Sequence, residues 1–242
     1  YLGRPVARLS YGTTNMVALR RVNFYIGVSD PMTDILIDRG FPADRIYTIY
    51  NGIDFKTPIQ TVPKEEFLKS VGMNWQEGDV IAGIAARLSP VKDIPTLLRA
   101  MKIACEKTSH LKLLLAGDGE DREKLENMAK ELGIADKVCF AGWLSDINSF
   151  YNAIDINLLT SLSETFPYSL TEGTRMHRAT IASNVGGVPV LIADGINGLI
   201  FEPGNEQQLA QHLLTLVEDS ELRKTFGERI YQKASHEFSI DR

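Results

Sequence analysis

Residues 79–119 read DVIAGIAARLSPVKDIPTLLRAMKIACEKTSHLKLLLAGDG. The runs 79–85 and 111–116 are short, apolar and bounded by turn residues, which is typical of buried strands. Between them, the apolar residues of 94–107 recur with the period of a helix. A strand, a helix and a second strand in this order form a βαβ unit. This unit indicates an α/β fold with a parallel sheet.

The same alternation extends to both sides of this unit. Further strands are predicted at residues 23–28, 46–50, 137–141, 155–160, 180–183 and 198–201. Further helices are predicted at residues 121–132, 168–176 and 206–219. We therefore expect a Rossmann-like parallel sheet with helices on both faces.

The stretch 54–63 contains prolines and has no periodicity, so we place a domain boundary there. Residues 1–57 are expected to be the remnant of one α/β domain with a linker. Residues 58–233 are expected to form a second, complete α/β domain, and residues 234–242 to begin a crossover segment without a closing helix. The chain starts without an initiator Met and soon enters a strand-like run at 6–9, from which we expect a piece of a longer protein.

The composition limits the classes of function. The chain has 242 residues, of which 44% are hydrophobic and 24% charged, as in ordinary globular proteins. Its net charge of -5 gives no basic excess of the kind that indicates nucleic acid as the main partner. Cys105 and Cys139 belong to no C-x-x-C pair, so we expect buried thiols rather than a disulfide or a metal site. No apolar run approaches the roughly 20 residues of a membrane span. We expect a cytoplasmic protein, with peripheral association at the inner face of the membrane left open.

Ligands of open α/β sheets bind beyond the carboxyl ends of the strands, so the loops after the strands are candidates for a site. The first such loop holds Arg87 and Lys92, which can converge on a phosphate, Arg as a fork and Lys as a point charge. Two solvated loop cations explain this pair equally well on its own.

Two more of these loops are rich in glycine or apolar residues. Gly117 opens a Gly-Asp-Gly turn that permits a positive φ and close approach of a ligand, although a plain tight turn explains it better on its own. Gly142 precedes Trp143 and Leu144, an apolar loop that could flank a planar nucleobase. Packing of Trp143 between structural elements is an equal alternative.

A fourth loop leads into a helix predicted to start near Thr165 or Phe166, because Pro167 suits the first turn of a helix. Free N–H groups at the positive end of the helix dipole make an anion site, and a diphosphate would fit between it and the two cations. Glu172 could accept hydrogen bonds from the vicinal hydroxyls of a ribose. Glu164 would lie on the sugar side of the phosphates. Both acids could also be ordinary surface carboxylates.

Taken in order along nearly the whole chain, these residues resemble the retaining GT-B glycosyltransferases often called family 4. The matching pieces are Val28-Ser29, Asn51-Gly52-Ile53-Asp54, Arg87-Leu88 with Lys92, Gly117-Asp118-Gly119, Phe140-Ala141-Gly142, Glu164 with Glu172 as the E-x7-E pair, Val185-Gly186-Gly187-Val188-Pro189 and Asp194-Gly195-Ile196-Asn197-Gly198. No single piece is specific, but their order is.

The resemblance implies a donor substrate that is a UDP-, GDP- or ADP-linked sugar, with no metal and no cofactor. Arg87 and Lys92 would neutralise the diphosphate, Glu172 would hold the ribose, and Glu164 would contact the sugar hydroxyls. The other donor contacts implied are Gly117, Gly142, Trp143, Leu144, Thr165, Phe166, Tyr168, Ser169 and Leu170. The implied reaction is sugar transfer with retention to a glycan, lipid or small-molecule acceptor, in cell-surface polysaccharide or glycoconjugate synthesis.

The sequence departs from the family pattern at several positions. Asp93 and Thr165 stand where the family often has glycine, and Thr165 adds bulk beside the sugar. His177 takes a position at a helix end that favours a left-handed residue. Tyr11 replaces a family His. Two alternatives stay open: a GT-B-type sugar-nucleotide epimerase, and an inactive nucleotide-sugar-binding module. We also expect the N-terminal GT-B domain to be largely absent and the isolated chain to be inactive.

Overall fold

The structure is a computed structural model that describes residues 22–241. The strand-like run at 6–9 and Tyr11 lie outside the described residues. The chain separates into two compact units, Tyr1–Tyr50 and Asn51–Arg242. None of the helices in residues 22–241 has the length and apolar character needed to span a lipid bilayer.

In the first unit, β1 (Tyr25–Gly27) and β2 (Ile46–Thr48) pair in parallel. Between them the chain forms α2 (Asp30–Asp38) and a 3-10 turn, η1 (Ala43–Arg45). Both strands are found but are shorter than the sequence predicts, and the sequence analysis did not predict helix α2 between them.

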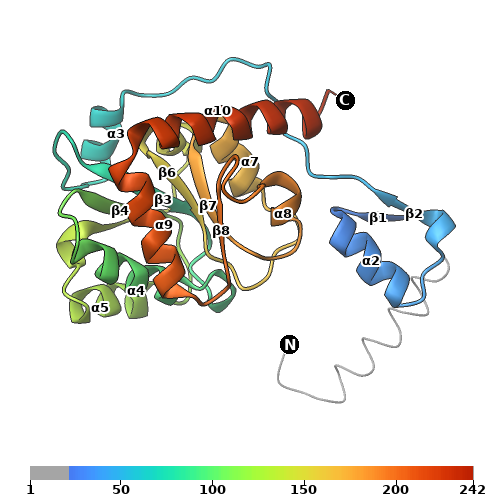
Figure 1. Cartoon of the computed structure of the whole chain (residues 1–242), viewed down its shortest axis with the longest axis horizontal. Coiled ribbons are helices and arrows are strands. Elements are labelled where there is room, and N and C mark those ends of the chain that lie inside the picture. Colours follow the sequence, from blue (N-terminus) through green and yellow to red (C-terminus); the bar gives the residue numbers. More distant parts are fainter. Residues whose placement is uncertain (1–21, 242) are drawn as a thin grey trace. The chain divides into compact units, whose positions relative to one another are not determined.

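The second unit contains a six-stranded parallel sheet in the order β5-β4-β3-β6-β7-β8 (Figure 1). Its strands are β3 (Val80–Ala85), β4 (Leu111–Ala116), β5 (Val138–Gly142), β6 (Ile156–Leu159), β7 (Ala179–Ser183) and β8 (Leu199–Phe201). Each predicted strand of this unit is found with its ends shifted by at most one residue. The predicted α/β class and the parallel sheet are therefore confirmed.

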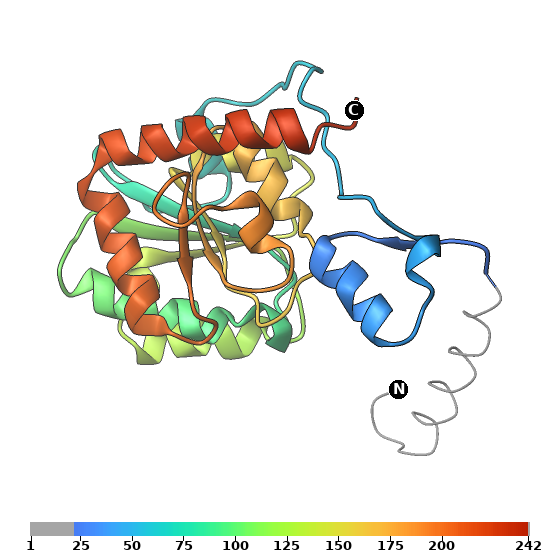
Figure 2. The ribbon, with the colours of Figure 1, turned by 45° about the vertical axis from the view of Figure 1, so that its right-hand side comes forward.

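Helices cover both faces of this sheet, as predicted. The helical elements of the unit are α3 (Lys64–Ser70), η2 (Pro90–Lys92), α4 (Ile94–Cys105), α5 (Arg122–Glu131), η3 (Ala135–Lys137), α6 (Ile147–Ala153), α7 (Tyr168–Arg175), α8 (Val188–Leu191), α9 (Glu206–Glu218) and α10 (Ser220–Glu237). On one face lie α4, α5 and α9, and on the other α3, α6, α7 and α10 (Figures 1 and 2).

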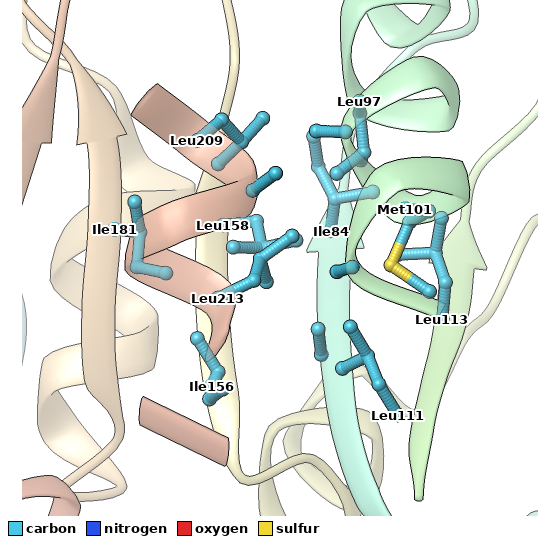
Figure 3. Close-up of a cluster of buried hydrophobic side chains, with 14 of the residues drawn as sticks. Ile84, Leu97, Met101, Leu111, Leu113, Ile156, Leu158, Ile181, Leu209 and Leu213 are labelled. Atoms are coloured by element: carbon cyan, nitrogen blue, oxygen red, sulfur yellow. The ribbon is translucent and has the colours of Figure 1, made fainter. Parts of the chain in front are cut away.

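Alternation along the buried strands builds two apolar layers, because successive side chains of a strand point to opposite faces. On one face, Leu97 and Met101 of α4 lie over β3 and β4, beside Leu209 and Leu213 of α9 (Figure 3). On the other face, Ile81 of β3 belongs to the layer that contains α3 and α6. The sheet is thus buried on both sides, which explains the continuous apolar runs in the sequence.

Two predictions about helix ends are wrong. The predicted helix range 168–176 is confirmed to within one residue by α7, but the start near Thr165 or Phe166 is wrong, because Pro167 is extended, with φ -76° and ψ 132°. The helical conformation is also disfavoured for any residue that directly precedes a proline. Phe166 is therefore excluded from the first turn of α7.

The second error concerns α10, which the sequence analysis missed, since we expected no closing helix. Asp219 caps this helix by accepting a hydrogen bond from Leu222 N at 2.8 Å. Its buried positions include Phe226, Ile230 and Ala234, which recur every fourth residue. Their signal in the sequence is weak because charged and small residues separate them.

The chain order reverses at the centre of the sheet. From β3 the chain proceeds outward through β4 to β5, and it then returns to place β6 on the other side of β3. Ligands of open parallel sheets bind outside the carboxyl ends of the strands at such a switch point. The loops that follow β3 and β6 meet there.

Candidate functional site

Backbone contacts join the loops that follow β3, β4 and β5. Leu88 N donates to Asp118 O at 3.0 Å, and Gly117 N donates to Gly142 O at 2.7 Å. Gly117 has a φ of +137°, and a Cβ at this residue would overlap the carbonyl oxygen of Ala86. The predicted positive φ is confirmed, and glycine lets the first two loops stack closely.

These loops and the start of α7 line a pocket of about 380 Å³. The predicted site residues in its lining are Arg87, Gly117, Trp143, Leu144, Ser169 and Glu172. Sequence reasoning missed Ser145 and Ile147, which also line it. The pocket therefore brings residues from four separate loops of the prediction to one place.

The pocket has a cationic side, an acidic side and an apolar wall. The exposed Arg87 makes no hydrogen bond or ion pair with any residue in 22–241. Trp143 is 84% exposed, so the alternative that it packs between structural elements is wrong. An exposed indole beside Leu144 can stack on a planar ring.

Glu172 is held by a tyrosine from the neighbouring helix. The hydroxyl of Tyr151, on α6, donates to Oε2 of Glu172 at 3.0 Å. Burial raises the pKa of Tyr151 well above its usual range, and the nearby carboxylate raises it further, so the hydroxyl keeps its proton. Sequence reasoning missed Tyr151 because it did not predict α6.

Lys92 and Glu164 form an ion pair, with 2.5 Å between Nζ and Oε1, and neither residue is part of the pocket lining. Their side chains are 22% and 12% exposed. The hydroxyl of Ser161 donates to the same Glu164 oxygen at 2.6 Å, and that of Thr160 to the Lys92 carbonyl at 2.7 Å. The readings of Glu164 as a surface acid and of Lys92 as a solvated cation are therefore wrong.

The first turn of α7 presents two backbone N–H groups. Within residues 22–241 no acceptor pairs with the N–H of Tyr168 or Ser169, whereas that of Leu170 bonds to the Pro167 carbonyl at 3.2 Å. Free N–H groups at the positive end of a helix attract anions. The start of α7 therefore lies two to three residues later than expected, and anion binding at its free N–H groups stays a prediction.

The other predicted donor contacts are less direct. The side chains of Phe166 and Leu170 are each 1% exposed and belong to the core, so only their backbone could reach a ligand. Thr165 and Tyr168 are exposed but lie outside the pocket lining. For these four residues and for Gly142, as for the predicted residues in the pocket lining, contact with a donor stays a prediction.

Three contacts support the loop that carries Glu164. The backbone N–H of Gly187 donates to Thr165 O at 2.7 Å, and the side-chain amide of Asn51 donates to Phe166 O at 2.8 Å. Gly186 has a φ of +50°, and a Cβ there would overlap the Glu164 carbonyl oxygen. The loop position therefore depends on two distant segments of the chain.

The C-terminal segment also supports this loop. Ile53 N donates to Phe238 O at 2.9 Å, and Ile240 N donates to Ile53 O at 3.1 Å. The Phe238 ring packs on Phe166 with 5.0 Å between centroids. Segments 51–53 and 238–240 thus form a joint support under the start of α7.

Two further expectations concern metal ligands and thiols. Within residues 22–241 no group of three or more His, Cys, Asp or Glu side chains is arranged to hold a metal ion. Cys105 and Cys139 are free thiols, as expected, but half-buried rather than buried, and burial raises the pKa of both thiols. The absence of a metal from the mechanism stays a prediction.

A second pocket, of about 410 Å³, lies along β5, with Val71, Lys137 and Phe140 in its lining. None of the predicted site residues lines it. Among the described residues its only cation is Lys137, which lies 3.7 Å from the Asp136 carboxylate. This pocket is a poor candidate for binding a polyanion.

A family model described as glycosyl transferases group 1 matches residues 67–233. Among curated proteins, N-acetyl-alpha-D-glucosaminyl L-malate synthase of Bacillus anthracis is 29% identical over 206 residues, covering 83% of this chain and 52% of that protein. The lipopolysaccharide core biosynthesis glycosyltransferase LpsE of Rhizobium meliloti is 28% identical over 173 residues, covering 67% of this chain and 51% of that protein. The chain spans about half the length of these curated relatives.

Solved structures of similar fold include HepE of Anabaena in complex with UDP-glucose, with a TM-score of 0.83 and 26% identity. That match covers 92% of this chain and 62% of HepE. The C-terminal domain of a group 1 glycosyl transferase, LpcC of Francisella tularensis, has a TM-score of 0.69 and 25% identity, covering 78% of this chain and all of that domain. The predicted likeness to GT-B glycosyltransferases is confirmed.

Proposed function

The chain belongs to the glycosyl transferases group 1 family, and on that premise we propose that its pocket binds a nucleotide-diphosphate sugar. The whole protein would transfer the sugar to an acceptor. The observation that carries the proposal is the combination of Arg87, Glu172 and the start of α7 around one pocket at the switch point. Cation, carboxylate and helix amides match the diphosphate and ribose of such a donor.

The proposed pose follows the chemistry of the lining. The nucleobase lies against Trp143 and Leu144, and the ribose hydroxyls donate to Glu172. The diphosphate lies between Arg87 and the free amides of α7. We propose that Lys92, which pairs with Glu164, also contacts the diphosphate and that the Glu164 carboxylate faces the sugar; the ion pair between the two residues supports this pose.

We propose UDP as the nucleotide, supported by the solved complexes of HepE with UDP and UDP-glucose, at 25% and 26% identity. The reaction proposed is transfer with retention at the anomeric carbon. Arg87, Lys92 and the α7 amides would stabilise the leaving diphosphate in place of a divalent ion. The names of the relatives suggest an acceptor hydroxyl on a surface glycan, a lipid-linked glycan or a small molecule.

A thermal-shift screen tests the donor assignment on the chain itself. A ligand that binds only the folded state adds about 2.7 kcal/mol of stability at a hundred times its Kd. We expect UDP-glucose to raise the melting temperature, and GDP- and ADP-glucose to raise it less. No shift with any of the three would contradict the proposed function.

Transfer itself needs the whole protein and an acceptor. With a radiolabelled UDP-sugar, the proposal predicts label in an acceptor extract and an anomeric linkage of unchanged configuration. Epimerisation of the free donor without transfer would favour the epimerase alternative. Binding without either reaction would favour the inactive module.

The support of the Glu164 loop gives a further prediction. Asn51→Ala and Asn152→Ala each remove one hydrogen bond from a side-chain amide to a backbone carbonyl. Asn51 donates to Phe166 O at 2.8 Å, and Asn152 donates to Val62 O at 3.3 Å. Each loss is expected to cost about 1 kcal/mol of unfolding free energy. Only Asn51→Ala should weaken UDP-glucose binding, by a few-fold, because only Asn51 contacts the loop at the site. Urea unfolding and calorimetry measure the two effects, and equal affinities in both variants would refute the coupling.

A further inference from the structure

The hydroxyl of Tyr151 has two acceptors within reach but only one hydrogen. It lies 3.0 Å from Oε2 of Glu172 and 3.2 Å from the carbonyl oxygen of Ser169. A phenol can donate a single hydrogen bond. The Tyr151 hydrogen is available to Glu172 because other donors reach the Ser169 carbonyl, which lies in the first turn of α7 and can accept the N–H four residues on.

One of these donors is a buried amide. Asn157, on β6, donates from Nδ2 to the same Ser169 carbonyl at 3.2 Å. Gly173 provides the space for it, since a Cβ on Gly173 would overlap the Asn157 side-chain amide. Because Asn157 donates a hydrogen bond to the Ser169 carbonyl, the hydroxyl hydrogen of Tyr151 remains available for the Glu172 carboxylate.

Burial of the Asn157 side-chain amide lowers the stability of the fold. Asn157 is 1% exposed, and its Oδ1 has no hydrogen-bond partner within residues 22–241. A buried polar atom without a partner opposes folding, whereas an apolar side chain in this strand would not. Its presence under the pocket is better explained by the site than by stability.

The Glu172 carboxylate is left with one open oxygen. Oε2 accepts the bond from Tyr151, while Oε1 has no partner in the described part of the chain, and Glu172 lines the pocket. A carboxylate fixed through one oxygen presents the other in a single orientation. Such a pre-oriented acceptor discriminates by penalising ligands that lack the matching hydroxyl.

We propose that Tyr151, aided by Asn157, is the positioning residue for Glu172 and makes this site select ribonucleotides over 2′-deoxyribonucleotides. The inference rests on the proposed function, because it assumes a nucleoside diphosphate in the pocket. Tyr151 touches no ligand in this account. It acts through Glu172, whose carboxylate receives the ribose hydroxyls.

Calorimetry on the full chain with UDP and 2′-deoxy-UDP tests the proposal. The wild type is expected to bind UDP about 10-fold or more tightly than 2′-deoxy-UDP, as for a hydrogen bond to a charged group. Tyr151→Phe keeps the buried ring and removes only the hydroxyl. It should weaken UDP binding by about 10-fold and weaken binding of 2′-deoxy-UDP, which keeps only the 3′-hydroxyl, by a smaller factor, so that the selectivity falls.

Two further variants separate positioning from a merely structural role. In a Glu172→Ala background, Tyr151→Phe should have no further effect on UDP affinity, since the group that it positions is gone. A structural role would weaken both nucleotides in both backgrounds. Asn157→Leu should reduce the selectivity by a smaller factor than Tyr151→Phe, because Ser169 then competes for the Tyr151 hydrogen.

The outcomes are distinguishable. Unchanged selectivity in a folded Tyr151→Phe protein, or equal loss for UDP and 2′-deoxy-UDP, would overturn the inference and leave the proposed function standing. If Tyr151→Phe does not fold, Asn157→Leu must reduce the selectivity, or the inference fails. Absence of any nucleotide binding by the wild type would overturn the proposed function and this inference with it.

Discussion

Replacing Arg87 and Lys92 together by alanine is expected to weaken UDP-glucose binding by about 100-fold or more. Arg87 lines the pocket with no partner in residues 22–241, and Lys92 lies at the switch point against Glu164. A diphosphate in the pocket would lose both cations and keep only the backbone amides of α7. Calorimetric titration of the double variant measures the loss.

The single variants should differ from each other. Arg87→Ala is expected to lower affinity without lowering stability, because Arg87 pairs with no described residue. Lys92→Ala should lower both, since it leaves the Glu164 carboxylate, which is 12% exposed, without its cation. Urea unfolding separates the two effects.

A control with the same change of charge removes two exposed cations far from the pocket lining. Lys102 and Lys224 pair with Glu106 at 3.3 Å and Glu221 at 2.7 Å on helix surfaces. Lys102→Ala with Lys224→Ala should leave the affinity for UDP-glucose unchanged at moderate salt. If the Arg87 and Lys92 double variant binds as well as this control, the assignment of the phosphate site is wrong.

Gly186→Ala is expected to cost about 2–4 kcal/mol of unfolding free energy and to displace the Glu164 loop. The residue has a φ of +50°, and its Cβ would overlap a backbone oxygen, that of Glu164, which cannot rotate away as a side chain can. Because a displacement of about 1 Å at a reacting group can lower a rate by about 100-fold, transfer by the folded variant of the whole protein should fall by up to about that factor.

Gly133→Ala is the matched control for this substitution. Gly133 has a φ of +69°, but a Cβ there would meet no atom within 4 Å. Gly133→Ala is expected to lower the unfolding free energy by about 1–2 kcal/mol, because only the strain of the left-handed backbone is added, and to leave donor binding unchanged. Equal costs for the two alanines in urea unfolding would show that the contact between Gly186 and Glu164 does not matter.

The strands of the second unit were predictable because both faces of its sheet are buried. The run Leu111–Ala116, for example, is buried at every position, and all of its residues except Lys112 are apolar. Helices α6 and α10 were not predictable in the same way. Only one side of α10 is buried, and its contacts include the small residues Gly227 and Ala234, which carry little hydrophobic signal.

The left-handed backbone conformation at two positions was predictable from the family pattern, although the residues there differ from it. The non-glycine residues with positive φ in the described chain are Asp93, at 46°, and His177, at 54°. Asp93 stands where the resemblance expects glycine, and His177 where glycine would suit better. Asp and His tolerate the left-handed region better than most residue types. The backbone can therefore keep the expected conformation at both positions without glycine.

The site was predictable where it depends on loop position, and not where it depends on tertiary contacts. Arg87, Gly117 and Glu172 follow strand ends, so the sheet rule places them together. Tyr151 and Asn157 act through hydrogen bonds beneath the pocket, and nothing in the local sequence indicates those partners. The pairing of Lys92 with Glu164, 72 residues apart, could not be derived from spacing either.

The most direct test of the central claim is a crystal structure of this chain with UDP-glucose. The account predicts the ribose hydroxyls on Glu172, the diphosphate between Arg87 and the N–H groups of Tyr168 and Ser169, and the base beside Trp143. Ordered nucleotide elsewhere, such as in the pocket lined by Val71, Lys137 and Phe140, with the Arg87 pocket empty, would contradict it.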